Sequence, residues 1–400
     1  MPALTPDDPQ VLAQAVVTAL TVDVDPQARE ASIAFWERGV AYRRAVLEAA
    51  EKVADDTICR LLAALRADPT DTHPQRELTN HLRDLAALRD LSTEELFALA
   101  WQAESNSRLG YHLGQRYGGP PATKAEVGEL RALQAGASLP AAADPPVLIV
   151  VPFRDRGPGL RLRNLLACLL SLRDQSAPRS SYRVVVVESD DTPRWRDVIL
   201  PYTDHYLFAP KSGTFNKSWA VNAGAVNTPG RPEIICVLDA DVLTDRDFVS
   251  RNAARFRRPG TMGHLTYRDM WCLDEPSTSW AIRQRLHERA PEAGSDHLRA
   301  FVLRRPPGCC VWARASAYHR IQGMDERFEG WGGEDNDFAY RMDYHSAFDH
   351  YNDPLLHMYH PSSALLREDG DTVNAHIPAL SWRPTEPIGD LTRFVGTPVT

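Results

Sequence analysis

The pattern of apolar and polar positions changes near residue 140. Up to about residue 135, apolar side chains recur at helical spacing. Examples are Ile33, Trp36, Val40 and Leu47, and further on Leu78, Leu82, Leu85 and Leu96. Ser92, with Glu95 three residues later, forms a capping box that predicts a helix start. Since this part contains no catalytic motif, we predict a helical accessory domain over residues 1–135, which would also offer a surface for a homo-oligomer.

A small, proline-rich stretch follows, with the sequence AGASLPAAADPP at 135–146. Such a composition is typical of a linker, and we place the domain boundary at residues 136–146. The segment from about residue 366 to 400 is again rich in proline and polar residues. We expect it to form an irregular C-terminal tail.

Between these segments the pattern becomes that of short buried strands. The runs VLIVVPF (147–153), YRVVVVES (182–189) and EIICVLDAD (233–241) alternate with two helical patterns, at 160–174 and 216–226. Uninterrupted apolar strands that alternate with helices predict an α/β domain, over residues 147–365, with a parallel sheet covered on both faces. Ligands of such sheets bind outside the carboxyl ends of the strands, where this chain has PFRDR, ESDD and DAD.

Charge and cysteine content narrow the class of protein. The formal net charge is −8, which argues against a nucleic-acid binder held by phosphate contacts. The six cysteines include no CxxC pair and mostly lie in apolar surroundings, so we expect buried thiols in a reducing compartment. The N-terminus lacks the features of a signal peptide, and no apolar run approaches the ~20 residues of a spanning helix. We therefore expect a cytoplasmic protein without a transmembrane segment.

The first chemical motif is Asp239-Ala240-Asp241, at the end of an apolar run. Two carboxylates two residues apart on a strand point to the same side and can hold a divalent ion that also bridges a diphosphate. The alternative is an ordinary solvated turn after a strand.

The second motif is GWGGEDNDF at 330–338. Glycines around Trp331 give a mobile loop, and the indole offers a face on which a sugar ring can stack. Glu334, Asp335 and Asp337 follow as a dense acidic group. The alternative is a helix N-terminus, whose dipole also favours acidic residues.

Three further segments have weaker signals. His357 and His360 are three residues apart and can reach one Mn²⁺ or Zn²⁺ ion, although core or surface histidines give the same pattern. Arg154 in PFRDR can grip a diphosphate bidentately. In the Phe215-Asn216-Lys217 segment, the aromatic ring can stack on a base and the lysine can meet a phosphate. The alternative for both segments is ordinary loop residues.

The order PFRDR, FNKSWAVNAGA, VLDADV, GMDERFEGWGGEDND and HMYH resembles the inverting glycosyltransferases of GT-A fold. Among these enzymes, the motif pattern resembles that of the β-1,4-galactosyltransferases and of family 2 enzymes of the bacterial chondroitin-polymerase type. The resemblance covers roughly residues 147–362 and leaves the first ~140 residues unexplained. It implies a Rossmann-like, mostly parallel sheet.

The resemblance also implies a role for each matching residue. Asp335 corresponds to the catalytic base and Glu334 to the residue that holds sugar hydroxyls. Asp241 and His360 correspond to metal ligands, and His357 falls where the galactosyltransferases have a methionine ligand. The residues that correspond to donor-binding positions are Pro152, Phe153, Arg154, Arg156, Glu188, Phe215, Lys217, Asp239, Trp331 and Gly332. The chain has EDND where the family has EDDD, and Lys217 where the galactosyltransferases have arginine, so the sugar specificity stays open.

We therefore predict a glycosyltransferase that uses Mn²⁺ or Mg²⁺ and moves a sugar, with inversion, from a nucleotide-sugar, most simply a UDP-sugar. The acceptor is open among a glycan, a peptide, a lipid and a small natural product. Two other classes of protein are considered. A nucleotidyltransferase would need basic residues that bind a triphosphate, and it would have no use for the GWGGED motif. A non-catalytic nucleotide-sugar or carbohydrate-binding protein would have lost Asp335 or Asp241, and both are present.

Overall fold

The computed structural model describes residues 6–118, 123–133, 144–362, 367 and 373–395. The chain forms two compact units. Unit 1 consists of Met1–Lys124, Asp269–Ala281 and Gly294–Arg305, and unit 2 of Ala125–Arg268, Ile282–Ala293 and Pro306–Thr400. Most of the predicted linker, residues 136–143, lies outside the described residues, as do several parts of the predicted tail. The described part of the tail, residues 373–395, contains only turns and bends.

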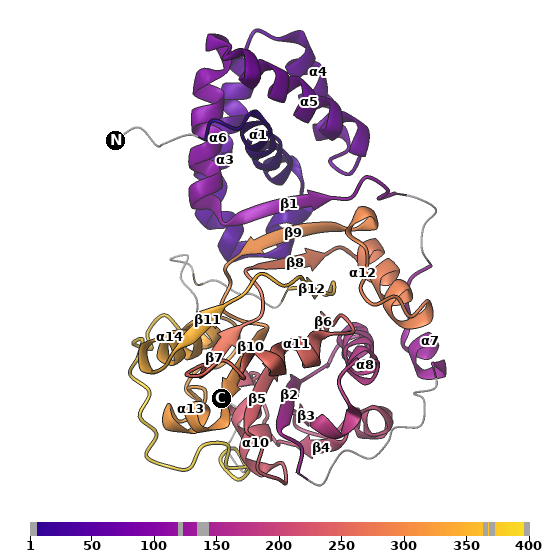
Figure 1. Cartoon of the computed structure of the whole chain (residues 1–400), viewed down its shortest axis with the longest axis vertical. Coiled ribbons are helices and arrows are strands. Elements are labelled where there is room, and N and C mark those ends of the chain that lie inside the picture. Colours follow the sequence, from indigo (N-terminus) through magenta and orange to yellow (C-terminus); the bar gives the residue numbers. More distant parts are fainter. Residues whose placement is uncertain (1–5, 119–122, 134–143, 363–366, 368–372, 396–400) are drawn as a thin grey trace. The chain divides into compact units, whose positions relative to one another are not determined.

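Unit 1 is mainly helical, as the spacing of its apolar residues predicts (Figure 1). Its N-terminal segment contains α1 (Pro9–Val24), α2 (Gln27–Ala31), α3 (Ile33–Lys52), α4 (Asp56–Ala67), α5 (Thr72–Leu88), a 3₁₀ turn (Leu91–Thr93), α6 (Glu94–Ser107) and β1 (Leu109–Leu113). The later segments add β8 (Asp269–Leu273), α12 (Glu275–Ile282), a 3₁₀ turn (Ser295–His297) and β9 (Arg299–Arg304). Strand β1 pairs antiparallel with β9, and β9 pairs antiparallel with β8.

Three details of unit 1 differ from the sequence-based expectation. Helix α6 begins at Glu94, and Asp90 caps the preceding 3₁₀ turn, so Ser92 does not act as the capping residue. Strand β1 forms where only helix was expected, because its partner β9 lies almost 200 residues later in the chain. The buried face of α3 contains Val46 and also Arg43, whereas the predicted apolar stripe is only partly buried. Arg43 donates to Ser107 and to the Trp36 carbonyl, which stabilises its buried guanidinium.

Unit 2 contains the predicted α/β sheet. Strand β2 (Val147–Phe153) pairs in parallel with β3 (Tyr182–Glu188) on one side and with β5 (Ile234–Leu238) on the other. Strand β4 (His205–Phe208) continues the parallel part beyond β3. Beyond β5, strand β10 (Cys310–Arg314) is antiparallel to both β5 and β7 (Gly263–Leu265). Strand β11 (Phe348–His350) pairs in parallel with β7 and closes the order β11-β7-β10-β5-β2-β3-β4.

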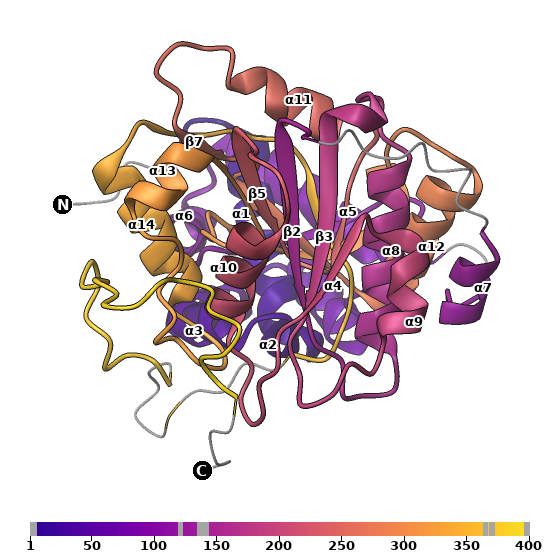
Figure 2. The same ribbon diagram turned by 90° about the horizontal axis from the view of Figure 1, so that it is seen from below.

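The helices of unit 2 cover both faces of this sheet (Figure 2). On one face lie α10 (Lys217–Asn227), α13 (Ala315–Arg320) and α14 (Glu334–His345), whose apolar side chains share one core with alternate residues of β2, β3 and β5. On the other face lie α8 (Leu160–Arg173) and α9 (Arg196–Ile199). The remaining elements are α7 (Val127–Ala132), 3₁₀ turns at Arg179–Ser181 and Leu200–Tyr202, β6 (Val242–Leu243), α11 (Phe248–Arg255), a π-helical turn at Arg283–His287, and β12 (Leu355–His357).

Two further expectations concern the cysteines and membrane-spanning helices. Five of the six cysteines are buried and Cys59 is exposed. Among the helices of the described residues, none is both long enough and apolar enough to cross a membrane.

Candidate active site

The candidate site lies where the parallel strands of unit 2 end. Because β2 pairs with both β3 and β5, their carboxyl ends lie side by side. Arg154 follows β2, Glu188 ends β3, and Asp239 follows β5. Residues from PFRDR, ESDD and DAD therefore meet at one edge of the sheet, as the topology requires.

A largely buried lysine, whose side chain is 12% exposed, joins two acidic residues at this edge, and we call Lys217, Asp239 and Asp335 the lysine cluster. The Lys217 Nζ atom lies 2.8 Å from Oδ1 of Asp239 and 3.0 Å from each carboxylate oxygen of Asp335. Burial alone would lower the pKa of Lys217, but the two carboxylates raise it well above its usual value. Burial also raises the pKa of Asp239 to about 6, although Lys217 opposes this change. The lysine is therefore charged, and it holds Asp335 beside the strand end.

The loop before β10 fits closely against Asp335. A Cβ atom on Gly308 would lie 2.1 Å from Oδ2 of Asp335, so only glycine leaves room for this carboxylate. The buried Tyr267 hydroxyl donates to the carbonyls of Pro306 and Gly308 and fixes the loop. Gly308 and Tyr267 thus position Asp335, and nothing in their local sequence indicated this role.

A second group surrounds Asp241, and we call Asp241, His357, His360 and Cys309 the histidine cluster. His360 Nε2 lies 2.7 Å from Oδ2 of Asp241, and His357 Nε2 lies 3.4 Å from Oδ1. Ligand atoms of Asp241, Cys309 and His357 all lie within 4.8 Å of one another. Oδ1 of Asp241 is buried and has no hydrogen-bond partner. Carboxylate, imidazole and thiol groups at this spacing fit a divalent transition-metal ion, which would satisfy that oxygen.

The hydrogen bonding of His360 points to the same need for a cation. Its Nδ1 lies 2.9 Å from the Pro361 carbonyl, which can only accept, so Nδ1 carries the proton. In a neutral ring, Nε2 then presents a lone pair to the Asp241 carboxylate. This contact is favourable only when a proton or a metal ion lies at Nε2, and a carbonyl behind a histidine is a common support for metal ligation. Burial favours a raised pKa for Asp241, but the two histidines outweigh it and hold the pKa below its usual value.

Backbone pairing brings the two histidines to Asp241. Strand β12 pairs with β6, so that His357 lies opposite Val242, and Met358 N–H donates to the Asp241 carbonyl at 2.8 Å. From α8, the buried Asn164 side chain donates to the Tyr359 carbonyl at 3.1 Å. Cys309 reaches the cluster because β10 pairs antiparallel with β5, and its carbonyl accepts from the Asp239 N–H at 2.8 Å. Cys309 and Asn164 are further residues that the sequence reasoning missed.

The predicted nucleotide-binding residues are engaged mainly with the protein itself. Arg154 donates to the carbonyls of Ser189, Lys211 and Gly213, and its guanidinium lies over the Phe215 ring at 5.1 Å. Burial lowers the pKa of Arg154 to about 10. The Glu188 carboxylate is fully buried and accepts from Tyr206 Oη and from Trp195 N–H.

Pro152 and Phe153, which were also predicted to bind the donor, belong to the PFRDR segment and are buried within β2. Arg156 pairs with Asp190 and keeps 40% of its side chain exposed. Of the arginines in PFRDR, Arg156 is therefore the more accessible to a ligand.

The glycine–tryptophan loop has a backbone that requires its glycines. Gly330, Gly332 and Gly333 all have positive φ angles, between 73° and 100°. The Gly330 N–H donates to the Phe215 carbonyl at 2.8 Å, and Asn374 donates to the Gly332 carbonyl at 2.9 Å. These contacts place the half-buried Trp331 directly before α14.

The acidic group after this loop divides into two parts. Glu334 and Asp335 begin α14, as the alternative of an acidic helix N-terminus predicts, and Asp335 also reaches Lys217. Burial, reinforced by Asp335, raises the pKa of Glu334 to about 7. Asp337 points away into an ion pair with Arg341 at 2.7 Å. Glu334 and Asp335 therefore face the site, whereas Asp337 supports the helix.

Two segments of the chain match models of known protein families. Residues 148–322 match the model of glycosyl transferase family 2, and residues 303–360 match that of the N-terminal domain of galactosyltransferase. The resemblance that the motifs of the chain indicated is therefore confirmed for residues 148–360, which match models of glycosyltransferase families. Both clusters lie within or directly beside these matched segments.

Two solved structures with low similarity can be named. The structure of residues 1–349 of S. aureus TarS is 11% identical, with a TM-score of 0.38, over 53% of this chain and 60% of that one. A mutant Drosophila β-1,4-galactosyltransferase 7, in complex with manganese, UDP-Gal and xylobiose, is 16% identical, with a TM-score of 0.31, over 54% of this chain and 71% of that one. The chain thus spans about 60% of the TarS structure. No curated protein sequence matches the chain.

Proposed function

We propose that this glycosyltransferase is metal-dependent and inverting, and that it transfers a sugar from a UDP-sugar to an acceptor hydroxyl. The observation that carries the proposal is the unpartnered, buried Oδ1 of Asp241 between His357 and Cys309, beside a separate carboxylate, Asp335, on the same sheet edge. A metal-dependent inverting transferase needs both features. One group of ligands must hold the cation, and a different carboxylate must be available as a base.

In this proposal the histidine cluster holds the cation, with Asp241 and His360 as the principal ligands and His357 and Cys309 beside them. When bound, Mn²⁺ or Mg²⁺ neutralises the charge of the leaving diphosphate. Asp239 and Lys217 bind the donor from the next positions on the edge. Arg156, Phe215 and Glu188 line or support the nucleotide side.

Asp335 accepts the proton of the acceptor hydroxyl as that oxygen attacks the anomeric carbon. Glu334, one residue earlier on α14, accepts hydrogen bonds from sugar hydroxyls. Trp331 and Gly332 cover the sugar and exclude water, which would otherwise compete as the acceptor. An attack from the face opposite the leaving group inverts the anomeric configuration.

Binding tests separate this proposal from its alternatives. The unfolding temperature of the full chain is measured with UDP-, GDP- and dTDP-sugars, with and without Mn²⁺, and in the Asp241→Asn variant. A ligand that binds only the folded state raises its stability. We expect a rise with a UDP-sugar that needs Mn²⁺ and is lost in Asp241→Asn.

Each alternative predicts a different result. Stabilisation by a nucleoside triphosphate and by no nucleotide-sugar would favour a nucleotidyltransferase. Binding of the UDP-sugar without any release of UDP, with or without added acceptors, would favour a non-catalytic binding protein. Full turnover in EDTA would contradict metal dependence.

A further inference from the structure

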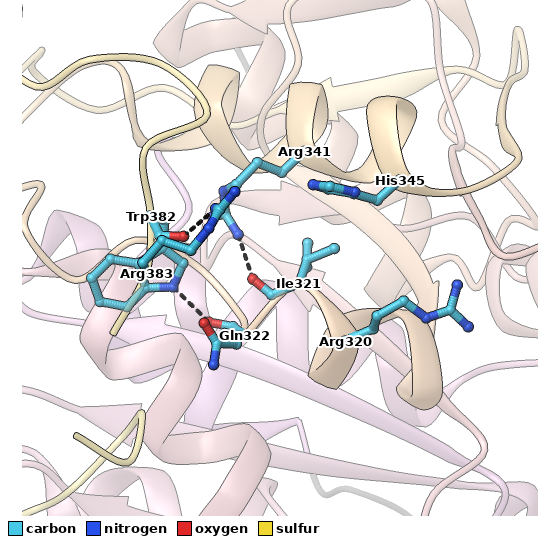
Figure 3. A pocket seen from close by; sticks show the side chains of 7 residues that line it. All are labelled: Arg320, Ile321, Gln322, Arg341, His345, Trp382 and Arg383. Atoms are coloured by element: carbon cyan, nitrogen blue, oxygen red, sulfur yellow. Dashed lines mark hydrogen bonds between the residues drawn. The ribbon is translucent and has the colours of Figure 1, made fainter. Parts of the chain in front are cut away.

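A cavity of about 310 Å³ lies in unit 2, lined by the end of α13 and the two residues after it, by the second half of α14 and by the C-terminal segment (Figure 3). Its lining residues are Arg320, Ile321, Gln322, Arg341, His345, Trp382 and Arg383. None of these residues belongs to either cluster of the active site. Asp335 and Arg341 lie on the same helix, six residues apart, which is about 9 Å along its axis.

Arg341 is the buried cation of this cavity, with only 1% of its side chain exposed. Its Nε donates to Asp337 at 2.7 Å, and its Nη1 donates to the carbonyls of Ile321 and Gly323 at 2.8 and 2.7 Å. Its Nη2 is buried and has no hydrogen-bond partner. Since buried donors are nearly always paired, this nitrogen marks a position where an acceptor is missing.

The other charged groups of the cavity are all basic. Arg320 and Arg383 are exposed, and His345 completes the basic set. Arg383 donates to the Trp382 carbonyl at 2.6 Å, and Arg320 forms no ion pair with any residue that the structure describes. Asp337 is the carboxylate that pairs with Arg341 and neutralises one of the three guanidinium groups. The lining therefore has an excess of positive charge.

We propose that this cavity binds the phosphate group of a small phosphorylated molecule. Guanidinium groups bind phosphate oxygens through paired, charge-assisted hydrogen bonds. Arg320 and Arg383 supply such donors among the exposed lining residues, and Nη2 of Arg341 is a buried donor that lacks an acceptor. The cavity is larger than a phosphate group needs, and the Trp382 side, with Ile321, leaves room for a sugar-sized remainder.

The test is a calorimetric titration of the full chain in EDTA with glucose 6-phosphate, inorganic phosphate and glucose. The variant R320S/R383S removes the two exposed cations, and R341K keeps a charge beside Asp337 but lacks the Nη2 donor. The matched control R257S/R258S removes two exposed arginines in the turn that follows α11. Unfolding without ligand shows whether each variant is folded.

We expect glucose 6-phosphate to bind more tightly than inorganic phosphate, and glucose not to bind. Affinity for glucose 6-phosphate should fall at least about tenfold in R320S/R383S and in R341K, and stay within twofold in R257S/R258S. Any phosphate that binds at the active site is common to all these proteins and cancels in the comparison. The proposal is overturned if the wild-type chain does not bind glucose 6-phosphate, or if R320S/R383S and the control bind it equally well.

Discussion

Each unit of the chain buries a cation between two carboxylates, Arg299 in unit 1 and Lys217 in unit 2. In unit 1, Arg299 lies between Asp25 and Asp274, and all three side chains are at most 6% exposed. Two further donors of Arg299 pair with Tyr111 Oη and with Gln27 Oε1. In unit 2, Lys217 lies between Asp239 and Asp335, whose side chains are 21% and 24% exposed.

The Arg299 cluster and the sheet edge of unit 2 differ in whether their buried polar groups have hydrogen-bond partners. The Asp274 carboxylate also accepts from Tyr117 Oη and from the Ser277 N–H, so the cluster of unit 1 is closed. On the sheet edge of unit 2, Asp241 keeps a buried oxygen without a hydrogen-bond partner, and the carboxylates of the lysine cluster are partly accessible. A closed ionic cluster stabilises a fold, whereas an open one is suited to a ligand.

The largest expected effect comes from a substitution in the lysine cluster of unit 2, where the carboxylates are partly accessible. Asp335→Asn keeps the size of the side chain but cannot accept a proton, and a positioned base contributes ~10²–10⁴-fold to a rate. We expect kcat to fall by about that factor while the Kd of the UDP-sugar with Mn²⁺ changes little. Asp343→Asn, on an exposed position of the same helix, is the control. Transfer by Asp335→Asn at a near wild-type rate would place the base elsewhere.

Breaking the closed cluster should affect stability and not chemistry. Arg299→Met leaves Asp25 and Asp274 buried without their cation, and loss of one partner from a buried pair costs about 3–5 kcal/mol. Urea unfolding should show this loss in the transition that includes unit 1. Arg29→Ser, which removes an exposed pair with Glu37, should cost less than about 1 kcal/mol. Equal stability of the two variants would mean that the Arg299 cluster is not what stabilises unit 1.

The smallest effect is a pH dependence that arises from Glu334. Since burial raises its pKa to about 7, the carboxylate form is present above that pH and is lost as the pH falls through it. At donor concentrations below KM, we expect the rate to fall about tenfold per pH unit below 7, as far as Glu334 alone limits it. Glu334→Gln should be slower at pH 8 and should lack this decline. An unchanged pH profile in Glu334→Gln would assign the titration to another group.

Much of unit 2 follows from local pattern. Val and Ile runs predict β2, β3 and β5, and their parallel pairing alone brings Arg154, Glu188 and Asp239 to one edge. Helices α8 and α10 also form where the apolar spacing indicated. These predictions succeed because each depends on a few neighbouring residues and on one rule of topology.

Contacts between distant segments could not be predicted in the same way. Cys309 joins Asp241 only because β10 returns beside β5, about 70 residues later. The segments with β8 and β9 join the N-terminal helices in unit 1, although they lie between strands of unit 2 in the sequence. Arg299 is buried because Asp25, 274 residues away, receives its charge. Apolar patterning reports which side chains are buried, but it does not identify their partners.

The most direct test of the account is the affinity of Mn²⁺ for three proteins, measured by calorimetry without donor: the wild type, Asp241→Asn and Asp335→Asn. Loss of a residue that merely supports a metal ligand costs 10–100-fold in affinity, so loss of the carboxylate ligand itself should cost at least about 100-fold. We predict that loss for Asp241→Asn, and an affinity within about threefold of wild type for Asp335→Asn. Wild-type affinity in Asp241→Asn, or an equal loss in both variants, would contradict the division of the site into a metal-binding and a catalytic cluster.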